Sequence, residues 1–185
     1  MVPKRMSGMT LVELLVVMTI AAILIGVGVP SFRYVTTSNR MSGEINNLLG
    51  DLQFARSEAL KEGQTVTVCS STDGNTCMTT SWERGWIVFS DPTAGQKSAN
   101  NLALRVQKAF LGGDTLKFDN NIQAISFNRE GFANEPLAFA PPALTATLHD
   151  KNVTLPWSRC LVVTAGRIAT ETAGPVSATQ LTACK

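Results

Sequence analysis

Histidine is nearly absent from this chain of 185 residues, in which His149 is the one histidine and is followed by Asp150 and Lys151 in a turn-like context. General acid–base and nucleophilic catalysis depend most often on a histidine or a free cysteine. We expect His149 to lie at the surface and the cysteines to be bonded, so the chain offers neither group. The sequence therefore predicts a non-enzymatic protein without a cofactor.

Metal-binding spacings are also missing. There is no C-x-x-C, and zinc sites usually combine such cysteine pairs with histidines. The tripeptide Asp73-Gly74-Asn75 supplies one carboxylate, far short of the oxygen cage that calcium needs, and such tripeptides usually form turns. We therefore expect no metal site.

Charge is absent from residues 14–32, a stretch long enough to cross a bilayer core about 30 Å thick. Lys4 and Arg5 precede it, so the N-terminal end should stay cytoplasmic and the rest should be exported. A secretory signal or a plain anchor would not be expected to carry Glu13, because an ionised carboxylate in a membrane segment costs free energy. Glu13 is therefore a candidate functional residue whose partner must be found.

The residues around Glu13 resemble the prepilin peptidase signal of type IV pilins and of the pseudopilins of type II secretion. The match consists of K-R-M-S-G followed by M-T-L-V-E-L-L-V-V. This resemblance implies cleavage after Gly8 and N-methylation of Met9, although the family usually has phenylalanine there. It also implies that the new amine of one subunit neutralises Glu13 of its neighbour on assembly. Pro30 falls where pilin helices often bend or melt locally.

The formal net charge is small, with sixteen Lys plus Arg and fourteen Asp plus Glu. Cleavage after Gly8 would remove two of the cations and leave fourteen residues of each sign. Such a chain is not expected to bind polyanions broadly.

Four cysteines in an exported chain are expected to form disulfides, and three connectivities are possible. We favour Cys69 with Cys77, which bracket a turn-rich loop, and Cys160 with Cys184, which would fix the C-terminal tail. Each bond would contribute about 3 kcal/mol in the chain-entropy model.

The patterning, together with the leader that the resemblance implies, predicts an α+β protein with three parts. Residues 1–8 form the leader. Residues 9–63 form one long helix, apolar over 9–32 and amphipathic over 33–63, where apolar residues recur at helical spacing. Residues 64–185 form an antiparallel β head, because short alternating runs are separated by turn residues. The resemblance implies the same arrangement, a type IV pilin-like fold with the helix packed on the sheet.

The head resembles the GspH/FimT-like minor pilins and pseudopilins. The residues that carry this likeness are Val66–Cys69, W-E-R-G-W-I-V-F-S-D at 82–91, I-S-F-N-R-E-G at 125–131 and C-L-V-V at 160–163. Trp86 and its apolar neighbours are also expected as core strand residues, so we use these motifs as markers of the fold.

FimT-like members of this family are associated with DNA uptake through a basic G-R-x-R motif. Residues 166–169 read G-R-I-A, so only Arg167 of the motif is present. Phosphate contacts by Arg167 together with Arg159, Lys151 and Lys185 would require these side chains to converge. Solvated strand and tail charges are the simpler interpretation.

The sequence therefore predicts a minor pilin that takes part in initiating or capping a type IV pilus. The resemblance implies a single-pass protein of the bacterial inner membrane with a periplasmic head, later incorporated in the pilus fibre at the cell surface. Its expected partners are the prepilin peptidase, membrane lipid, other minor pilins and the major pilin. A DNA-binding competence pilin and a minor pseudopilin of type II secretion remain the alternatives.

Overall fold

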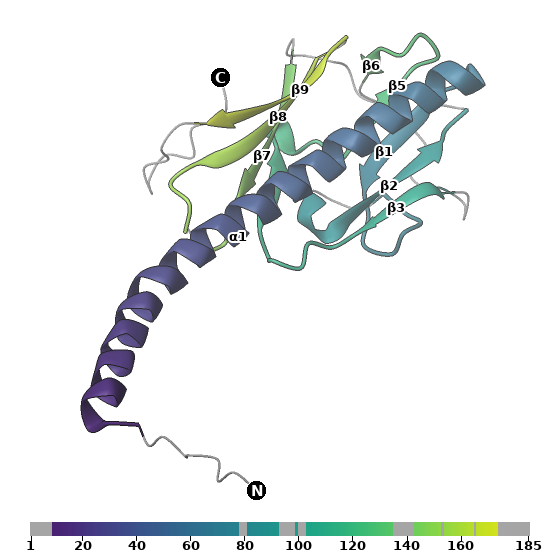
Figure 1. Cartoon of the computed structure of the whole chain (residues 1–185). Helices are drawn as coiled ribbons and strands as arrows, with labels where there is room; N and C mark the ends of the chain where they lie inside the picture. Colours follow the sequence, from purple (N-terminus) through teal and green to yellow (C-terminus); the bar gives the residue numbers. More distant parts are fainter. Residues whose placement is uncertain are drawn as a thin grey trace, which may run out of the picture. The chain divides into compact units, whose positions relative to one another are not determined.

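The computed structural model describes residues 9–77, 81–92, 99, 103–134, 143–152, 154–164 and 166–173. The chain divides into two compact units, Met1–Thr36 and Thr37–Lys185. One helix, α1 (Leu11–Glu62), contributes to both units (Figure 1). It continues through Pro30 without a break, so the local melting considered for that position is not present.

Both ends of α1 follow from local side-chain and backbone chemistry. The Thr10 hydroxyl accepts a hydrogen bond from the Glu13 amide at 3.2 Å, which caps the N-terminus, and Glu13 lies in the first turn where a carboxylate suits the helix dipole. At the other end Gly63 takes φ +66° and its N–H bonds to Ala59 O at 3.0 Å. The helix predicted for 9–63 is thus observed at 11–62.

The first unit exposes nearly all of its apolar side chains. Its most apolar 18-residue window has a mean hydropathy of 2.6, and none of that window is buried. The helix is therefore long and apolar enough to cross a membrane. Water is a poor solvent for such a surface, so lipid or neighbouring helices are expected to cover it.

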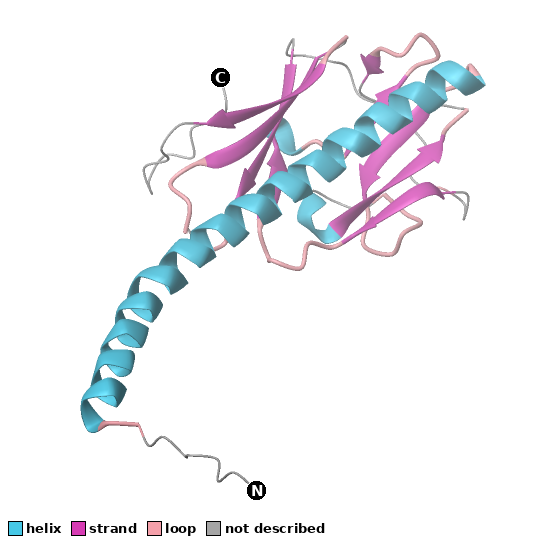
Figure 2. Cartoon of the chain, viewed as in Figure 1, coloured by secondary structure: helices cyan, strands magenta, loops and turns pink. Residues whose placement is uncertain are grey.

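The second unit contains two antiparallel sheets beside the C-terminal half of α1 (Figure 2). The five-stranded sheet has the order β3-β2-β1-β5-β6 and the four-stranded sheet the order β4-β7-β8-β9. The strands are β1 (Val66–Ser70), β2 (Gly85–Ser90), β3 (Ala103–Lys108), β4 (Thr115–Phe118), β5 (Ala124–Phe127), β6 (Ala133–Asn134), β7 (Ala143–His149), β8 (Ser158–Thr164) and β9 (Ile168–Ala173), with short 3₁₀ turns at Trp82–Arg84 and Asp119–Asn121.

The predicted α+β fold with a helix on an antiparallel head is confirmed. The head includes a hairpin in which β8 pairs with β9, from Ser158 opposite Ala173 to Val163 opposite Ile168. The alternation pattern did not indicate β4 or the division into two sheets.

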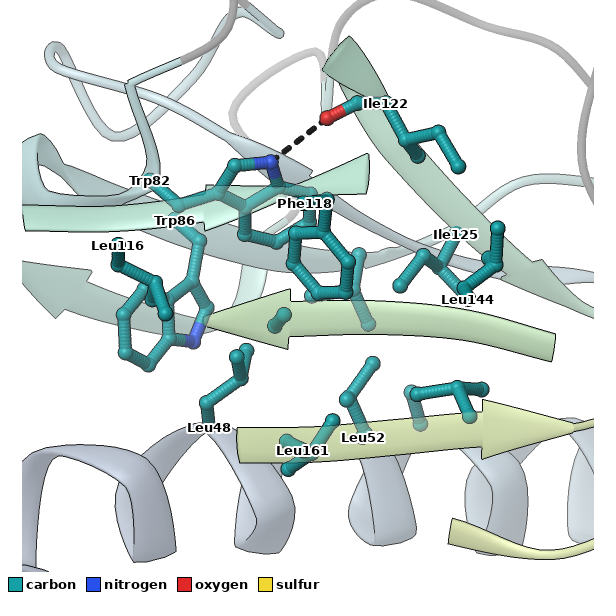
Figure 3. Packing of buried hydrophobic residues seen from close by; sticks show 14 of the residues in the cluster. Leu48, Leu52, Trp82, Trp86, Leu116, Phe118, Ile122, Ile125, Leu144 and Leu161 are labelled. Atoms are coloured by element: carbon teal, nitrogen blue, oxygen red, sulfur yellow. Dashed lines mark hydrogen bonds between the residues drawn. The ribbon is translucent and has the colours of Figure 1, made fainter. Parts of the chain in front are cut away.

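The larger of two hydrophobic clusters among the described residues joins α1 to both sheets. Figure 3 shows Leu48 and Leu52 of α1 close to side chains from the two sheets. Trp82 is fully buried, its indole N–H donates to Ile122 O at 2.8 Å, and its ring lies 4.7 Å from that of Phe118. The buried residues of the helix are Thr37, Met41, Glu44, Ile45, Leu48, Leu52, Ala55 and Ala59.

Leu52→Ala should lower the free energy of unfolding by about 2–5 kcal/mol, because it opens a cavity where α1 meets both sheets. Leu60→Ala on the same helix is the matched control, since Leu60 is 53% exposed and should cost less than about 1 kcal/mol. Urea denaturation of a Thr37–Lys185 fragment measures both. Equal losses for the two variants would contradict the assigned core.

Candidate functional site

The candidate assembly site lies at the start of α1. Met9 is 63% exposed, and Glu13 occupies the first helical turn. Glu13 forms no ion pair with any described residue, so within this part of the chain its charge is unneutralised. Gly8, the expected cleavage position, lies outside the described residues.

An ionic cluster ties α1 to two loops of the head. The Arg40 guanidinium donates to both oxygens of Asp114, at 2.9 and 2.8 Å, and reaches Asp150 Oδ1 at 3.4 Å. Glu44 lies one turn further along the helix, with Oε1 3.9 Å from Arg40 Nε. Three carboxylates thus surround one cation. Sequence reasoning gave no sign of this arrangement, because the two aspartates are 74 and 110 positions away from Arg40.

Burial weakens Glu44 as an acid. Its residue is only 8% exposed, and its Oε2 has no hydrogen-bond partner among the described residues. Burial first, and then the hydrogen bond and charge of Asp114, raise the pKa of Glu44 to about 8, although Arg40 opposes them. Glu44 is therefore largely protonated at neutral pH.

Asp150, in the same cluster, has a pKa below its ordinary value and remains ionised. Its burial would raise its pKa, but the backbone N–H groups of Thr154 and Asn152 donate to it at 2.7 and 3.3 Å and lower the pKa on balance. Its neighbour His149 is half-buried at the end of β7, so it lies at the surface without being fully exposed. Burial and then Lys117 lower the pKa of His149.

Three of the four basic residues considered for DNA contact, Arg159, Lys151 and Arg167, lie among the described residues, and each has different neighbours. Arg159 donates to Thr172 Oγ1 at 2.7 Å and Ser42 Oγ at 3.0 Å, and its guanidinium stacks 4.8 Å from the Trp157 ring centroid. These bonds hold it between β9 and α1.

The remaining candidates lie elsewhere. Lys151 packs beside Gly113, where a Cβ added to the glycine would meet the lysine Cδ at 3.1 Å, and Lys185 lies outside the described residues. Arg167 sits instead at a groove of about 330 Å³ between α1 and the β8–β9 turn, together with Arg56. Sequence reasoning missed Arg56, although its i+4 neighbour Leu60 marks the exposed face of the helix.

The three described cysteines, Cys69, Cys77 and Cys160, are all disulfide-bonded. Cys69 and Cys77 form a disulfide with a Cα–Cα distance of 5.5 Å. Cys160 is also disulfide-bonded, whereas its expected partner Cys184 lies outside the described residues. Inside the first loop, Asp73 accepts hydrogen bonds from the backbone of Asn75 and Thr76 and thereby forms the expected turn.

Among the described residues, no group of three or more His, Cys, Asp or Glu side chains could hold a metal ion. The cluster around Arg40 is occupied by the guanidinium itself. The arrangement is suited to neutralising and holding charge rather than to a chemical reaction.

Two family models match the chain. The model described as "Prokaryotic N-terminal methylation motif" matches residues 3–29, and the model described as "Type II transport protein GspH" matches residues 44–166. No curated protein matches. Two crystal structures of the Pseudomonas aeruginosa type IV minor pilin FimU share the fold at 23% identity. One covers 74% of this chain and 92% of the FimU chain with a TM-score of 0.55, and the other covers 68% and 88% with a TM-score of 0.50.

The long helix packed on antiparallel sheets is therefore a type IV pilin fold. The chain belongs to the GspH family of minor pilins and pseudopilins, as its motifs predicted. The family and its structural neighbours are structural pilins rather than enzymes, and membership implies assembly with other pilins and the pilus machinery. The methylation motif and the apolar helix indicate membrane anchoring followed by incorporation into a filament.

Glu44→Gln should raise stability at pH 8 and flatten its pH dependence. The folded-state pKa of about 8 lies above the ordinary 4.5, so between these values the folded protein holds a proton that the unfolded chain lacks. Stability from this group is full below about pH 4.5 and falls by up to about 1.4 kcal/mol per pH unit as pH rises toward 8. The side-chain amide of glutamine is neutral at all pH values, so the variant lacks this pH-dependent loss of stability.

Denaturation of the Thr37–Lys185 fragment from pH 4.5 to 8.5 measures this slope. The matched control is Glu130→Gln, an exposed glutamate whose pKa is lowered by Arg129 and which should leave the slope in place. A Glu44→Gln slope equal to that of the wild type would show that Glu44 is ionised when buried.

Proposed function

We propose that this protein is a minor pilin that takes part in initiating or capping a type IV pilus, as a non-enzymatic structural subunit. The observation that carries the proposal is the apolar first part of α1, which is exposed along its length and bears one unneutralised carboxylate, Glu13. A surface of this kind is stable only in lipid or against similar helices. The methylation motif over residues 3–29 supports the same use.

The proposed life cycle has two environments. Before assembly, α1 spans the bacterial inner membrane with the head in the periplasm, since Lys4 and Arg5 favour a cytoplasmic N-terminus. The prepilin peptidase then removes residues 1–8 and the new N-terminal residue, Met9, is methylated. The leader, the helix and the head thus have separate roles in this cycle. The disulfides in the head suit an oxidising compartment such as the periplasm.

Assembly would neutralise Glu13. Its carboxylate and the cationic amine of Met9 are four positions apart in one chain, so in a filament the amine of one subunit can reach Glu13 of its neighbour. In a low-dielectric filament core an unpaired charge costs several kcal/mol, whereas a pair offsets much of that cost. Pairing therefore favours one axial register between subunits.

A minor pseudopilin of type II secretion is the main alternative, and the GspH family includes that role. The likeness of the head to the type IV minor pilin FimU supports the pilus role. DNA uptake receives less support, because Arg159 and Lys151 point to separate sites and Arg167 lacks a second arginine at Ala169.

Co-expression with a prepilin peptidase should shorten the chain by the eight residues 1–8 and leave a methylated Met9. The physical reason is that the basic leader ends at Gly8, where the apolar helix begins. Intact-mass measurement of the purified protein decides this outcome. Cleavage near Pro30 instead would mean an ordinary signal peptide and would remove the pilin interpretation.

Glu13→Val should leave membrane insertion and cleavage intact but reduce incorporation into sheared pili by about tenfold, because the amine of the neighbour then stays unneutralised. Glu58→Gln, a change in the head-packed half of the helix, is the control. Immunoblots of sheared pili and of membranes give both quantities. Incorporation at the wild-type level would disprove the pairing, and a defect in type II secretion without loss of pili would favour the pseudopilin role.

A further inference from the structure

An open groove of about 330 Å³ lies between the C-terminal part of α1 and the β8–β9 turn. On the helix side, Gln53, Arg56, Ser57 and Leu60 line it and recur at i, i+3, i+4 and i+7, so they form one stripe. None of them belongs to the buried face of α1. The stripe is thus available to a partner.

The turn holds the side chain of Arg56 and the backbone of Arg167. Arg56 Nη1 donates to Gly166 O at 2.8 Å, which leaves its other N–H donors for a ligand. Arg167 is fixed by its backbone, because its N–H donates to Thr164 Oγ1 at 3.0 Å and its carbonyl accepts from the Thr164 N–H at 2.8 Å. A Cβ built at Gly166 would meet nothing within 4 Å, so the approach is open.

The charge of the groove is unbalanced. No carboxylate is among its described lining residues, and neither Arg56 nor Arg167 forms an ion pair with a described residue. Other cations of the head are neutralised differently, as Arg129 pairs with Glu130 at 2.8 Å. Leu60, 53% exposed, and half-buried Ile168 add apolar surface beside the two guanidiniums.

We propose that this groove docks an acidic peptide segment of a neighbouring pilin subunit, in which carboxylates alternate with an apolar side chain. Arginine binds carboxylates with two parallel hydrogen bonds, and the apolar surface of Leu60 and Ile168 beside the arginines suits an aliphatic side chain. The inference rests on the proposed function, because it names a contact that the head would use in assembly.

Nucleic acid fits the groove less well. A nucleic-acid site needs a track of cations along successive phosphates and usually an aromatic face for the bases. The groove has two cations and no aromatic lining residue among those described, and Arg159 is occupied by Ser42 and Thr172. A pair of cations suits a short peptide better.

The test uses the full chain in non-ionic detergent micelles, labelled with ¹⁵N-arginine so that each guanidinium Nε–H is observed separately. The probes are acetyl-Asp-Leu-Asp-Leu-Asp-amide and its counterpart with Asn at each Asp position. The acidic peptide should shift the Arg56 and Arg167 signals saturably and bind at least about fivefold more tightly than the Asn peptide.

Arg56→Gln and Arg167→Gln should each weaken binding of the acidic peptide by about two- to fivefold. Arg129→Gln, an exposed arginine outside the groove, should leave it unchanged. Equal affinity for the two peptides, or equal losses in all three variants, would overturn the proposal. Tighter binding of a thymidine oligonucleotide at the same two arginines would also overturn it, in favour of nucleic acid.

Pilus incorporation separates this proposal from the proposed function. If Arg56→Gln/Arg167→Gln loses peptide binding but enters sheared pili as the wild type does, the groove has no part in assembly and the minor pilin role stands. If the wild type never enters pili although it binds the acidic peptide, the proposed function fails while the specificity of the groove is retained.

Discussion

The burial of one stripe of α1 against both sheets is the interaction on which the head depends. Neither sheet shields its apolar face from water without the helix, because Val68 and Ile125 of one sheet and Leu144 and Leu161 of the other meet in a core that includes the helical stripe. A full set of such side chains supplies most of the favourable free energy of a small domain. The same helix that anchors the subunit is therefore also the centre of its folded head.

A network of charged side chains lies at the start of the stripe of α1 that packs on the sheets. Arg40 lies just before Met41, the first apolar core residue of α1, and its guanidinium contacts Asp114 before β4 and Asp150 after β7. Two loops of the four-stranded sheet are thereby tied to a single turn of the helix. Because Asp114 is fully buried, removal of Arg40 would leave a carboxylate without its main neutralising partner, which is more costly than loss of an exposed pair.

Sequence patterning predicted the elements whose signals are local. The change from a continuous apolar run to helical spacing marked the two halves of α1. The alternation of apolar residues with threonines, as in Val66 to Val68 and Leu144 to Leu148, marked strands. It could not indicate which strands pair, because β1 has β5 as a neighbour across more than fifty residues. For the same reason the ionic cluster and the meeting of Arg56 with Arg167 escaped detection. Three basic residues that looked alike in the sequence, Arg159, Lys151 and Arg167, have different surroundings.

Two glutamates of one helix show how environment sets the role of a carboxylate. Glu44 is buried inside the folded head, next to two other acids and one arginine, and protonation resolves its conflict within the subunit. Glu13 lies in the exposed apolar segment, where no described residue of its own chain neutralises it. Under the proposed function, the amine of a neighbouring subunit neutralises it. Because the conflict at Glu44 is resolved within the monomer and that at Glu13 is not, the subunit can fold before it polymerises. Folding before polymerisation is the order of events that a filament subunit requires.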